Sequence, residues 1–254
     1  VLSFLGDTDL FDYHDFLVPA GNEAVFYDAL FDYLPEMEWH TIELTSLPQD
    51  SCALGHVTSR AKSSGYAVEV QREDVAPVLR LPPTWDEYLA GLSKKRRHEL
   101  RRKLRRFEGA GVISHTVCDD PSALPECMQD FFRLHRASKQ DKAEFMTAER
   151  ERFFVDAAVE LASRGQFRLT FLAVDDIRVA SCMGFDYGDS YLLYNSGYDP
   201  SYSELSVGLL SKALSIRDAI GARKQTFDFL RGTERYKYDL GAEDIPIYRV
   251  TVRR

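Results

Sequence analysis

The carboxylate of Asp228 is a candidate for acid–base chemistry in this sequence. Asp228 lies near the end of a predicted strand, 225–230, and its neighbours Phe227 and Phe229 point to the opposite face of that strand. A carboxylate between two aromatic residues at a strand end can have a raised pKa, which suits a general base. The same carboxylate can instead cap the turn at Gly232, and the sequence alone does not separate these two roles.

A strand, a turn and a helix follow one another just before Asp228. The predicted strand 191–198 ends before Asp199-Pro200-Ser201, because proline fixes φ and cannot donate to a strand ladder. A helix follows, with apolar residues on one face: Leu205, Leu209, Leu210, Ala213 and Ile216 or Ile220. Unpaired N–H groups and the helix dipole make such an N-terminus suited to bind phosphate. An ordinary strand-to-helix connection has the same pattern.

The composition indicates a globular protein. Apolar residues make up 44% of the 254 residues and charged residues 28%. No apolar run reaches the roughly 20 residues that span a bilayer, and no signal peptide is visible, since the opening resembles an internal strand with further sequence upstream. The four cysteines form no C-x-x-C pair and the six histidines no H-x-x-x-H pair. We therefore expect free thiols, no metal site and a cytoplasmic protein.

A strongly basic segment stands out in this acidic chain. Residues 94–106 contain nine Lys or Arg and one acid, Glu99, so the net charge of −8 divides into +8 here and −16 elsewhere. The pattern predicts a helix, 94–108, that docks through an apolar stripe of Leu100, Leu104 and Phe107. We expect four of its cations to face outward, toward acidic surface or toward phosphates: Lys95, Arg102, Lys103 and Arg106. A solvated linker helix is the other interpretation.

The chain divides into three parts, 1–81, 82–111 and 112–254. The first part is predicted to contain strands 1–5, 12–18, 39–44, 66–71 and 77–81 and helices 22–34 and 51–64, with Asn22 as a helix cap. The middle part is a linker with a short helix and the basic helix. The last part is predicted to contain strands 112–118, 167–174, 178–187, 191–198, 225–230 and 246–252, helices 121–138, 147–164 and 206–220, and a loop at 141–146.

The order of elements in the last part resembles the GNAT acyltransferase fold. Three features resemble its CelD-like or Fem-like branch, which includes the BioF2-like acetyltransferase domains: the basic helix ahead of the domain, Leu134-His135 at the end of the first helix, and Gly232-Thr-Glu-Arg-Tyr-Lys237 after the penultimate strand. The resemblance implies a mixed α/β sheet flanked by helices. It also implies that residues 1–81 are a partial or degenerate copy of the same unit.

The resemblance implies a role for each candidate residue. An amine would attack a carbonyl held where strands 191–198 and 225–230 splay apart. The catalytic candidates are Asp228, Tyr236 (as the acid that protonates the leaving thiolate) and Asn195. The donor-binding candidates are Gly197, Tyr198, Ser203, Ser206, Val207, Gly208, Arg231 and Lys237, and the acceptor-binding candidates are His135, Arg136 and Glu234. A half-buried sheet tyrosine and a structural helix-end histidine are the ordinary alternatives for Tyr198 and His135.

The resemblance implies acetyl-CoA or another acyl-CoA as donor, no metal, and an acceptor amine on a small molecule, amino sugar or cell-envelope precursor. One departure concerns the phosphate loop, Q/R-x-x-G-x-G/A in many members. Here the segment 201–208 has a single Gly, no Gln or Arg, and Glu204 where a pyrophosphate would lie. Two alternatives therefore stay open: a Fem-like transferase that uses aminoacyl-tRNA, and a catalytically degenerate fold that serves as an interaction module.

Overall fold

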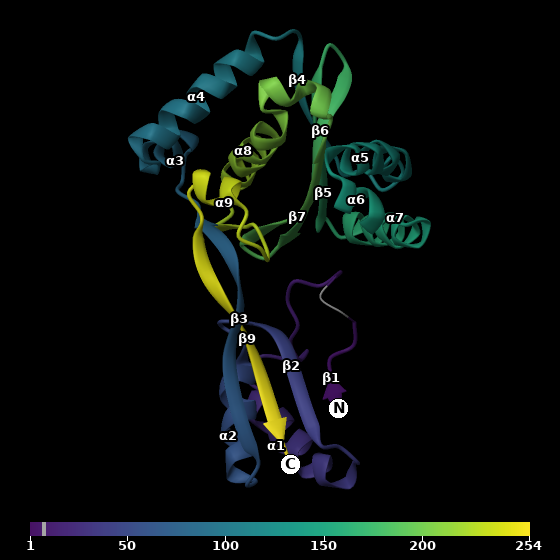
Figure 1. The fold of residues 1–254 in the computed structure, drawn as a ribbon, viewed down its shortest axis with the longest axis vertical. Helices are drawn as coiled ribbons and strands as arrows, with labels where there is room; N and C mark the ends of the chain where they lie inside the picture. Colours follow the sequence, from purple (N-terminus) through teal and green to yellow (C-terminus); the bar gives the residue numbers. More distant parts are fainter. Residues whose placement is uncertain (7–8) are drawn as a thin grey trace. The chain divides into compact units, whose positions relative to one another are not determined.

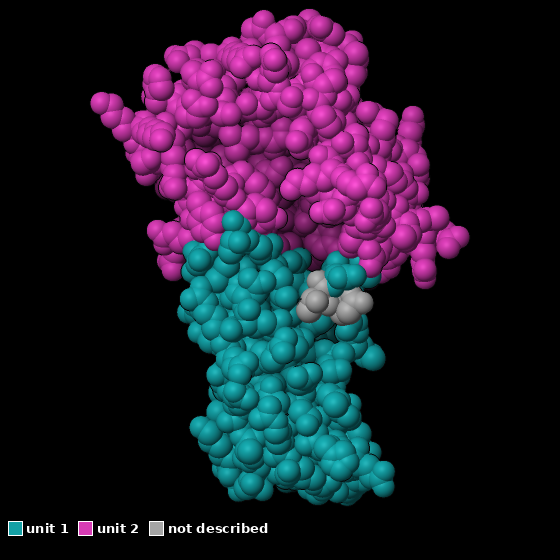
Figure 2. All heavy atoms as spheres, viewed as in Figure 1, with its two compact units in different colours: residues 1–77, 231–233, 244–254 teal, residues 78–230, 234–243 magenta. Residues whose placement is uncertain are grey.

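The computed structural model describes residues 1–6 and 9–254, which form two compact units (Figures 1 and 2). The first unit consists of residues 1–77, 231–233 and 244–254, and the second of residues 78–230 and 234–243. The predicted boundaries at residues 81 and 111, and the degenerate copy in the first part, remain predictions.

The first unit is a small sheet with helices packed on it. Its strands lie in the order β1-β2-β9-β3, with β1 (Leu2–Ser3) parallel and β9 (Glu243–Arg253) antiparallel to β2 (Thr41–Pro48), and with β3 spanning Ala67–Arg80. The helices are α1 (Glu23–Tyr33) and α2 (Cys52–Ser63), with a 3₁₀ turn, η1, at Leu34–Glu36. Their apolar faces meet β2 and β9 in one core, which includes Tyr27, Leu47, Val57 and Val250.

Three predictions for the first unit are wrong. Residues 12–18 form no strand, and the Asn22 side chain makes no cap hydrogen bond with α1. The two predicted strands around 66–81 are one continuous strand, β3. Pro77 lies within β3, because a strand tolerates proline where the ladder does not need an N–H from that residue.

The second unit has a mixed sheet between two layers of helices (Figure 1). The end of β3 pairs with β8 (Thr226–Asp228), and the order continues through β7 (Ser190–Tyr198), β6 (Ile177–Tyr187), β5 (Phe167–Val174) and β4 (Ile113–Cys118). One face is covered by α5 (Leu124–Ser138), α6 (Gln140–Phe145) and α7 (Ala148–Ser163), and the other by α8 (Val207–Gly221) and α4 (Lys94–Glu108). The remaining elements are α3 (Trp85–Gly91), the 3₁₀ helix η2 (Pro200–Leu205) and α9 (Arg235–Asp239).

The predicted splay of the sheet is confirmed. Strands β7 and β8 are parallel and pair at three positions, the last of which joins Leu192 to Asp228. Beyond that pair, β7 continues to Tyr198 while β8 has ended. A register shift between β6 and β7 leaves Tyr194 as an extra residue just past the last paired position, and a bulge of this kind bends a strand. The second half of β7 therefore has no strand partner on its β8 side.

The basic helix docks through its predicted stripe. Leu100 and Phe107 of α4 are buried, and Leu104 packs against the same core, which also contains Leu210 and Ile216 of α8. The Ser93 hydroxyl accepts a hydrogen bond from the Arg96 N–H and caps the helix. Burial of these apolar side chains holds the helix against the second unit, and the cations on its other faces lie at the surface of that unit.

The prediction of four free thiols is wrong for one pair. Cys118 at the end of β4 and Cys127 in the first turns of α5 form a disulfide, with 6.9 Å between their Cα atoms. Their spacing of nine residues matches no common sequence signature, and the two sulfurs meet only because α5 folds back beside β4. Cys52 and Cys182 are free, and Cys182 is buried.

Candidate functional site

The end of α5 lies directly on the splayed half of β7. A Cβ atom on Gly197 would lie 2.3 Å from the His135 backbone nitrogen and 2.4 Å from the Leu134 carbonyl carbon. Only glycine permits this approach, because the obstructing atoms belong to the backbone and cannot rotate away. The structure therefore gives Gly197 a packing role, while its predicted part in donor binding remains a prediction.

Three donors converge on the side-chain oxygen of Asn195 in β7. His135 Nε2 lies 3.0 Å from Asn195 Oδ1, Lys142 Nζ lies 3.2 Å away and the Ser196 N–H 2.9 Å away. Oδ1 can only accept, so His135 must carry its proton on Nε2. The other ring nitrogen, Nδ1, is buried and has no hydrogen-bond partner within the described residues. Asn195 and His135, predicted separately as catalytic and acceptor-binding residues, are thus in direct contact.

The His135 ring is held neutral. It is fully buried, between Phe131 and Phe145. Burial and the nearby Lys142 ammonium both disfavour the imidazolium and lower the pKa of His135 to about 4. At neutral pH the ring is therefore a fixed hydrogen-bond donor to Asn195.

Replacing His135 with glutamine is expected to flatten the pH dependence of stability between pH 6.5 and 4. The unfolded state binds a proton at His135 near pH 6.5 and the native state only near pH 4. Stability therefore falls as pH falls through this window, by at most about 1.4 kcal/mol per pH unit. Glutamine can still donate to Asn195 but does not titrate. Urea unfolding at pH 7.5, 6 and 5 should show the steeper fall in the wild type; parallel curves would contradict a neutral, buried His135.

Lys142 was not among the residues predicted for the site, and the helix that contains it, α6, was not predicted either. The predicted loop 141–146 is wrong: residues 140–145 form α6, a helix too short and polar to show a period. Lys142 Nζ donates to Asn195 Oδ1 and to the Ser196 carbonyl oxygen. Burial, with further contributions from Lys212 and Lys139, lowers the pKa of Lys142 to about 8.

The connection from β7 to α8 has the geometry of a tight corner. Asp199 caps η2 by accepting hydrogen bonds from the N–H and hydroxyl groups of Ser201. Ser206, whose N–H donates to the Ser203 carbonyl, has φ of 59° and precedes Val207, the first residue of α8. The Ser206 side chain does not cap that helix. The Tyr198 ring packs over Gly208, where a Cβ atom would lie 2.9 Å from it.

The basic helix α4 contacts this corner through two cations. Lys103 Nζ lies 2.9 Å from Ser206 Oγ, and Arg106 forms an ion pair of 3.3 Å with Glu204. The prediction that Lys103 faces outward is wrong. It lies three residues after Leu100 and four before Phe107, on the same helix face as the apolar stripe. Lys95 is exposed as predicted, and Arg102 pairs with Glu99 on its own helix.

The segment after β8 contains the buried amine of Lys237. The Asp228 carboxylate accepts the Leu230 N–H at 2.7 Å, in the geometry of a turn cap. Lys237 is buried and donates to the Leu230 carbonyl and to Glu234, both at 3.0 Å. Burial acts to raise the pKa of Glu234, but the Lys237 ammonium and hydrogen bonds outweigh it, and the net pKa is lowered.

Tyr236 lies beside a second lysine that sequence analysis missed. Lys212 of α8 is buried, donates to the Gly208 carbonyl at 2.8 Å, and lies 4.8 Å from the centre of the Tyr236 ring. Burial lowers the pKa of Lys212 and raises that of Tyr236. Lys212 looked like an ordinary polar position in the helix because its alkyl chain is buried along with the apolar face.

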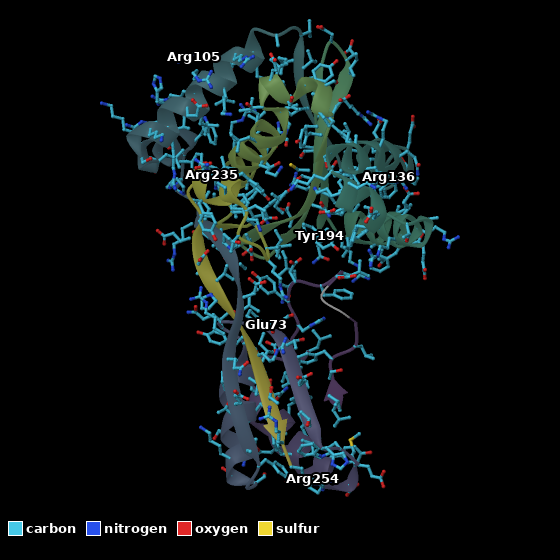
Figure 3. The ribbon with its side chains drawn as sticks, in the orientation of Figure 1. Glu73, Arg105, Arg136, Tyr194, Arg235 and Arg254 are labelled. Carbon is cyan, nitrogen blue, oxygen red and sulfur yellow. A yellow bond between two sulfur atoms is a disulfide. The ribbon has the colours of Figure 1, made fainter. Side chains whose placement is uncertain are left out.

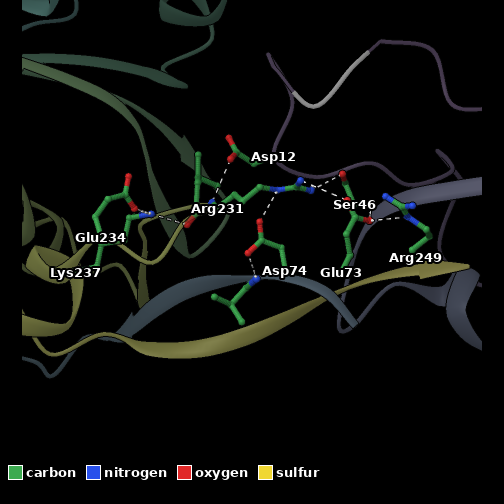
Figure 4. A network of polar contacts seen from close by, with 10 residues as sticks. Asp12, Ser46, Glu73, Asp74, Arg231, Glu234, Lys237 and Arg249 are labelled. Carbon is green, nitrogen blue, oxygen red and sulfur yellow. Dashed lines mark hydrogen bonds and ion pairs between the residues drawn. The ribbon is translucent and has the colours of Figure 1, made fainter. Parts of the chain in front are cut away.

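Two predicted site residues lie elsewhere. Arg231 belongs to the first unit, where its backbone N–H donates to Asp12 and its guanidinium contacts Ser46, Glu73 and Asp74 (Figure 4). Arg136, which is labelled in Figure 3, donates to the Met146 carbonyl and pairs with Glu151 of α7. The charge of each is already balanced by a carboxylate, and their predicted binding roles remain predictions.

Neither a metal centre nor a membrane span emerges from residues 1–6 and 9–254. These residues bring no three His, Cys, Asp or Glu side chains together as a metal ion would need. No helix among them is long and apolar enough to cross a membrane. The chemistry that the described side chains offer is acid–base and hydrogen-bonding chemistry around the splayed half of β7.

Comparisons with known proteins agree with this fold. A family described as acetyltransferase (GNAT) domains matches residues 94–238. Among solved structures, the chain is similar to FemX, with a TM-score of 0.65 and 11% identity, covering 92% of this chain and 78% of that one. It is also similar to a conserved protein of unknown function from Bacteroides thetaiotaomicron, with a TM-score of 0.60 and 13% identity over 91% and 75% of the two chains.

A third similar structure is L-PGS from Bacillus licheniformis, with a TM-score of 0.59 and 9% identity over 90% of this chain and 72% of that one. Identities this low relate these chains by fold alone. No curated protein matches the sequence.

Proposed function

Because this chain belongs to the GNAT acetyltransferase family, we propose that it is an N-acyltransferase that moves an acyl group from acyl-CoA to the amine of a small molecule, amino sugar or cell-envelope precursor. The observation that carries the proposal is the contact of Lys103 with Ser206 at the start of α8. It adds a cation to a helix N-terminus, where backbone N–H groups and the helix dipole already favour an anion.

The charge of Glu204 does not oppose this proposal. Its side chain is 83% exposed and pairs with Arg106, so its charge is solvated and partly neutralised. The pyrophosphate of CoA would bind at the N-terminus of α8, between Lys103 and the backbone of Ser206 to Gly208. The pantetheine would then run along the splayed half of β7 and bring the thioester to Asn195, Gly197 and Tyr198.

Replacing Lys103 with glutamine is expected to weaken CoA binding about tenfold, since a hydrogen bond to a charged group contributes about 1.5 to 3 kcal/mol and tenfold corresponds to about 1.4 kcal/mol. Isothermal titration of CoA into wild type and variant measures this. Lys95→Gln is the matched control, because it removes the same charge from an exposed position on the same helix. Equal affinities for the two variants would contradict the assignment of Lys103 to the phosphate, and an inability of the wild type to bind CoA would contradict an acyl-CoA donor.

An aminoacyl-tRNA donor is the second candidate, and the exposed cations of α4 favour it. Lys95, Arg101 and Arg105 are exposed and form no ion pair within the described part of the chain; Arg105 is labelled in Figure 3. FemX and L-PGS share the fold. Against this candidate, α4 has 15 residues and is about 22 Å long, and the preceding α3 has seven, which is short for an arm that binds tRNA.

The affinity for bulk tRNA, measured at two salt concentrations, distinguishes an aminoacyl-tRNA donor from an acyl-CoA donor. If tRNA is the donor, log affinity should fall with log salt by about 0.7 to 0.9 per phosphate contact. The combined variant Lys95→Gln, Arg101→Gln and Arg105→Gln should then lose that binding. We expect weak tRNA binding that the variant changes little.

A further inference from the structure

The splay of the sheet frees backbone groups of β7, and side chains satisfy those of Ser196. Past Leu192, β7 has no partner on its β8 side. The Ser196 N–H donates to Asn195 Oδ1, and the Ser196 carbonyl accepts from Lys142 Nζ. Buried backbone groups must find partners, so the amine of Lys142 is bound to the strand at the place where the sheet opens.

Lys142 has two hydrogen bonds, which is the number that a neutral amine can donate. Its partners within the described residues are Asn195 Oδ1 and the Ser196 carbonyl oxygen. A neutral amine has two N–H groups and one lone pair, whereas an ammonium has three N–H groups and no lone pair. With both N–H groups directed to β7, the lone pair of neutral Lys142 points away from the strand. An ammonium would instead direct its third N–H there.

The surroundings of Lys142 lower its pKa and so shift its proton equilibrium toward the neutral form. Burial is the main cause of its lowered pKa, followed by the ammonium groups of Lys212 on α8 and Lys139 at the start of α6. Cys182 of β6 and Glu234 ahead of α9 act in the opposite direction and do not outweigh them. The α5 side chain that reaches the same Asn195 oxygen is His135, which is uncharged at neutral pH.

We propose that Lys142 is the base that takes the proton from the acceptor's ammonium group before attack on the acyl donor. This inference rests on the proposed function. The ammonium R–NH₃⁺ passes one proton to Nζ, which becomes an ammonium. The freed amine forms the N–C bond and the C–S bond of the thioester breaks. The Tyr236 hydroxyl protonates the departing thiolate, and the second proton of the amine then restores that hydroxyl. Lys142 then returns its proton to water.

Other groups nearby are less suited to this step. His135 Nε2 donates its proton in a hydrogen bond to Asn195 Oδ1, and the pKa of about 4 makes the other ring nitrogen, Nδ1, a weak base. The Asp228 carboxylate accepts the N–H of Leu230, two residues further along the chain. Lys142 has a pKa of about 8, which is near the pH at which the reaction would run, and such a pKa suits a general base.

The first test does not require a known acceptor. Wild-type protein is labelled with trace acetic anhydride between pH 6.5 and 11, and peptide mass spectrometry follows each lysine. Lys142 is expected to gain reactivity with a midpoint near pH 8, well below the ordinary lysine value of about 10.4. A Lys142 midpoint at the ordinary lysine value overturns the proposal, whatever the enzyme does.

The second test follows CoA release from acetyl-CoA with a panel of primary amines. Lys142→Met and Lys142→Arg are both expected to lower kcat about 10²- to 10⁴-fold and to abolish the acid limb of the rate profile near pH 8. Arginine keeps the charge and the donors but cannot act as a base, so rescue by arginine would assign Lys142 a positioning role and overturn the proposal. The matched control Lys139→Arg should retain turnover.

The variant Asp228→Asn tests whether Asp228, rather than Lys142, is the base. If this variant loses the acid limb while the Lys142 variants keep it, Asp228 is the base and the proposal for Lys142 is wrong. If wild type transfers no acyl group to any amine and binds no CoA, the proposed function fails, and the labelling midpoint still decides whether Lys142 can be a base.

Discussion

Replacing Gly197 with alanine is expected to destabilise the protein by about 3 kcal/mol, at the upper end of the usual cost of overpacking. The added methyl would lie 2.3 Å from the His135 nitrogen and 2.6 Å from its Cα atom. Because these are backbone atoms of α5, the helix as a whole must move away from β7 to make room. That movement would also separate His135 from Asn195, which are 3.0 Å apart.

Urea unfolding monitored by circular dichroism measures this effect. Gly221→Ala is the matched control: Gly221 ends α8, and a Cβ there meets no atom within 4 Å. The control should leave stability unchanged or raise it by up to about 1 kcal/mol, since alanine favours a helix over glycine. A Gly197→Ala protein as stable as the control would show that α5 does not lie as close to β7 as described.

Replacing Tyr236 with phenylalanine is expected to lower kcat about 100-fold and leave the KM for the acyl donor nearly unchanged. If Tyr236 protonates the leaving thiolate, its hydroxyl acts only in the transition state, and losing it lowers the rate rather than binding. Burial raises the pKa of Tyr236, so the phenol carries a proton to donate at neutral pH. Phenylalanine keeps the ring, and with it the contacts to Phe229 and Lys212.

Initial rates of CoA release over a range of donor concentrations give kcat and KM separately. Tyr187→Phe is the control for loss of a hydroxyl, because Tyr187 lies at the end of β6 and is 71% exposed. Undiminished turnover in Tyr236→Phe would remove Tyr236 from the mechanism. A large rise in KM with unchanged kcat would indicate a ground-state contact instead of an acid.

Most of the second unit could be predicted because its elements are long and patterned. The stripe Leu100, Leu104 and Phe107 indicated how α4 docks, and Pro200 indicated where β7 ends. The predictions failed for a short helix and for a long strand that runs without a break. Helix α6 has six residues and no apolar period, and the long strand β3 was predicted as two strands, 66–71 and 77–81.

The candidate site was harder to predict than the fold, because its contacts join elements far apart in sequence. Asn195 and His135 were each visible, but their contact depends on Gly197 letting α5 reach β7. Lys142 and Lys212 gave no signal, because a lysine in a sequence is normally solvated. Only the tertiary structure shows that Lys212 is buried and that the Lys142 amine is bound to β7.

The most direct test of the central claim is a crystal structure of the protein with acetyl-CoA. The account predicts a pyrophosphate at the start of α8, within hydrogen-bonding distance of Lys103 Nζ, and a thioester carbonyl beside the stretch of β7 from Asn195 to Tyr198. Bound CoA that avoids the N-terminus of α8 would contradict the proposed phosphate site, and a structure without CoA at millimolar acetyl-CoA would contradict an acyl-CoA donor. The second of these results, together with tight and salt-sensitive binding of tRNA, would favour the aminoacyl-tRNA donor.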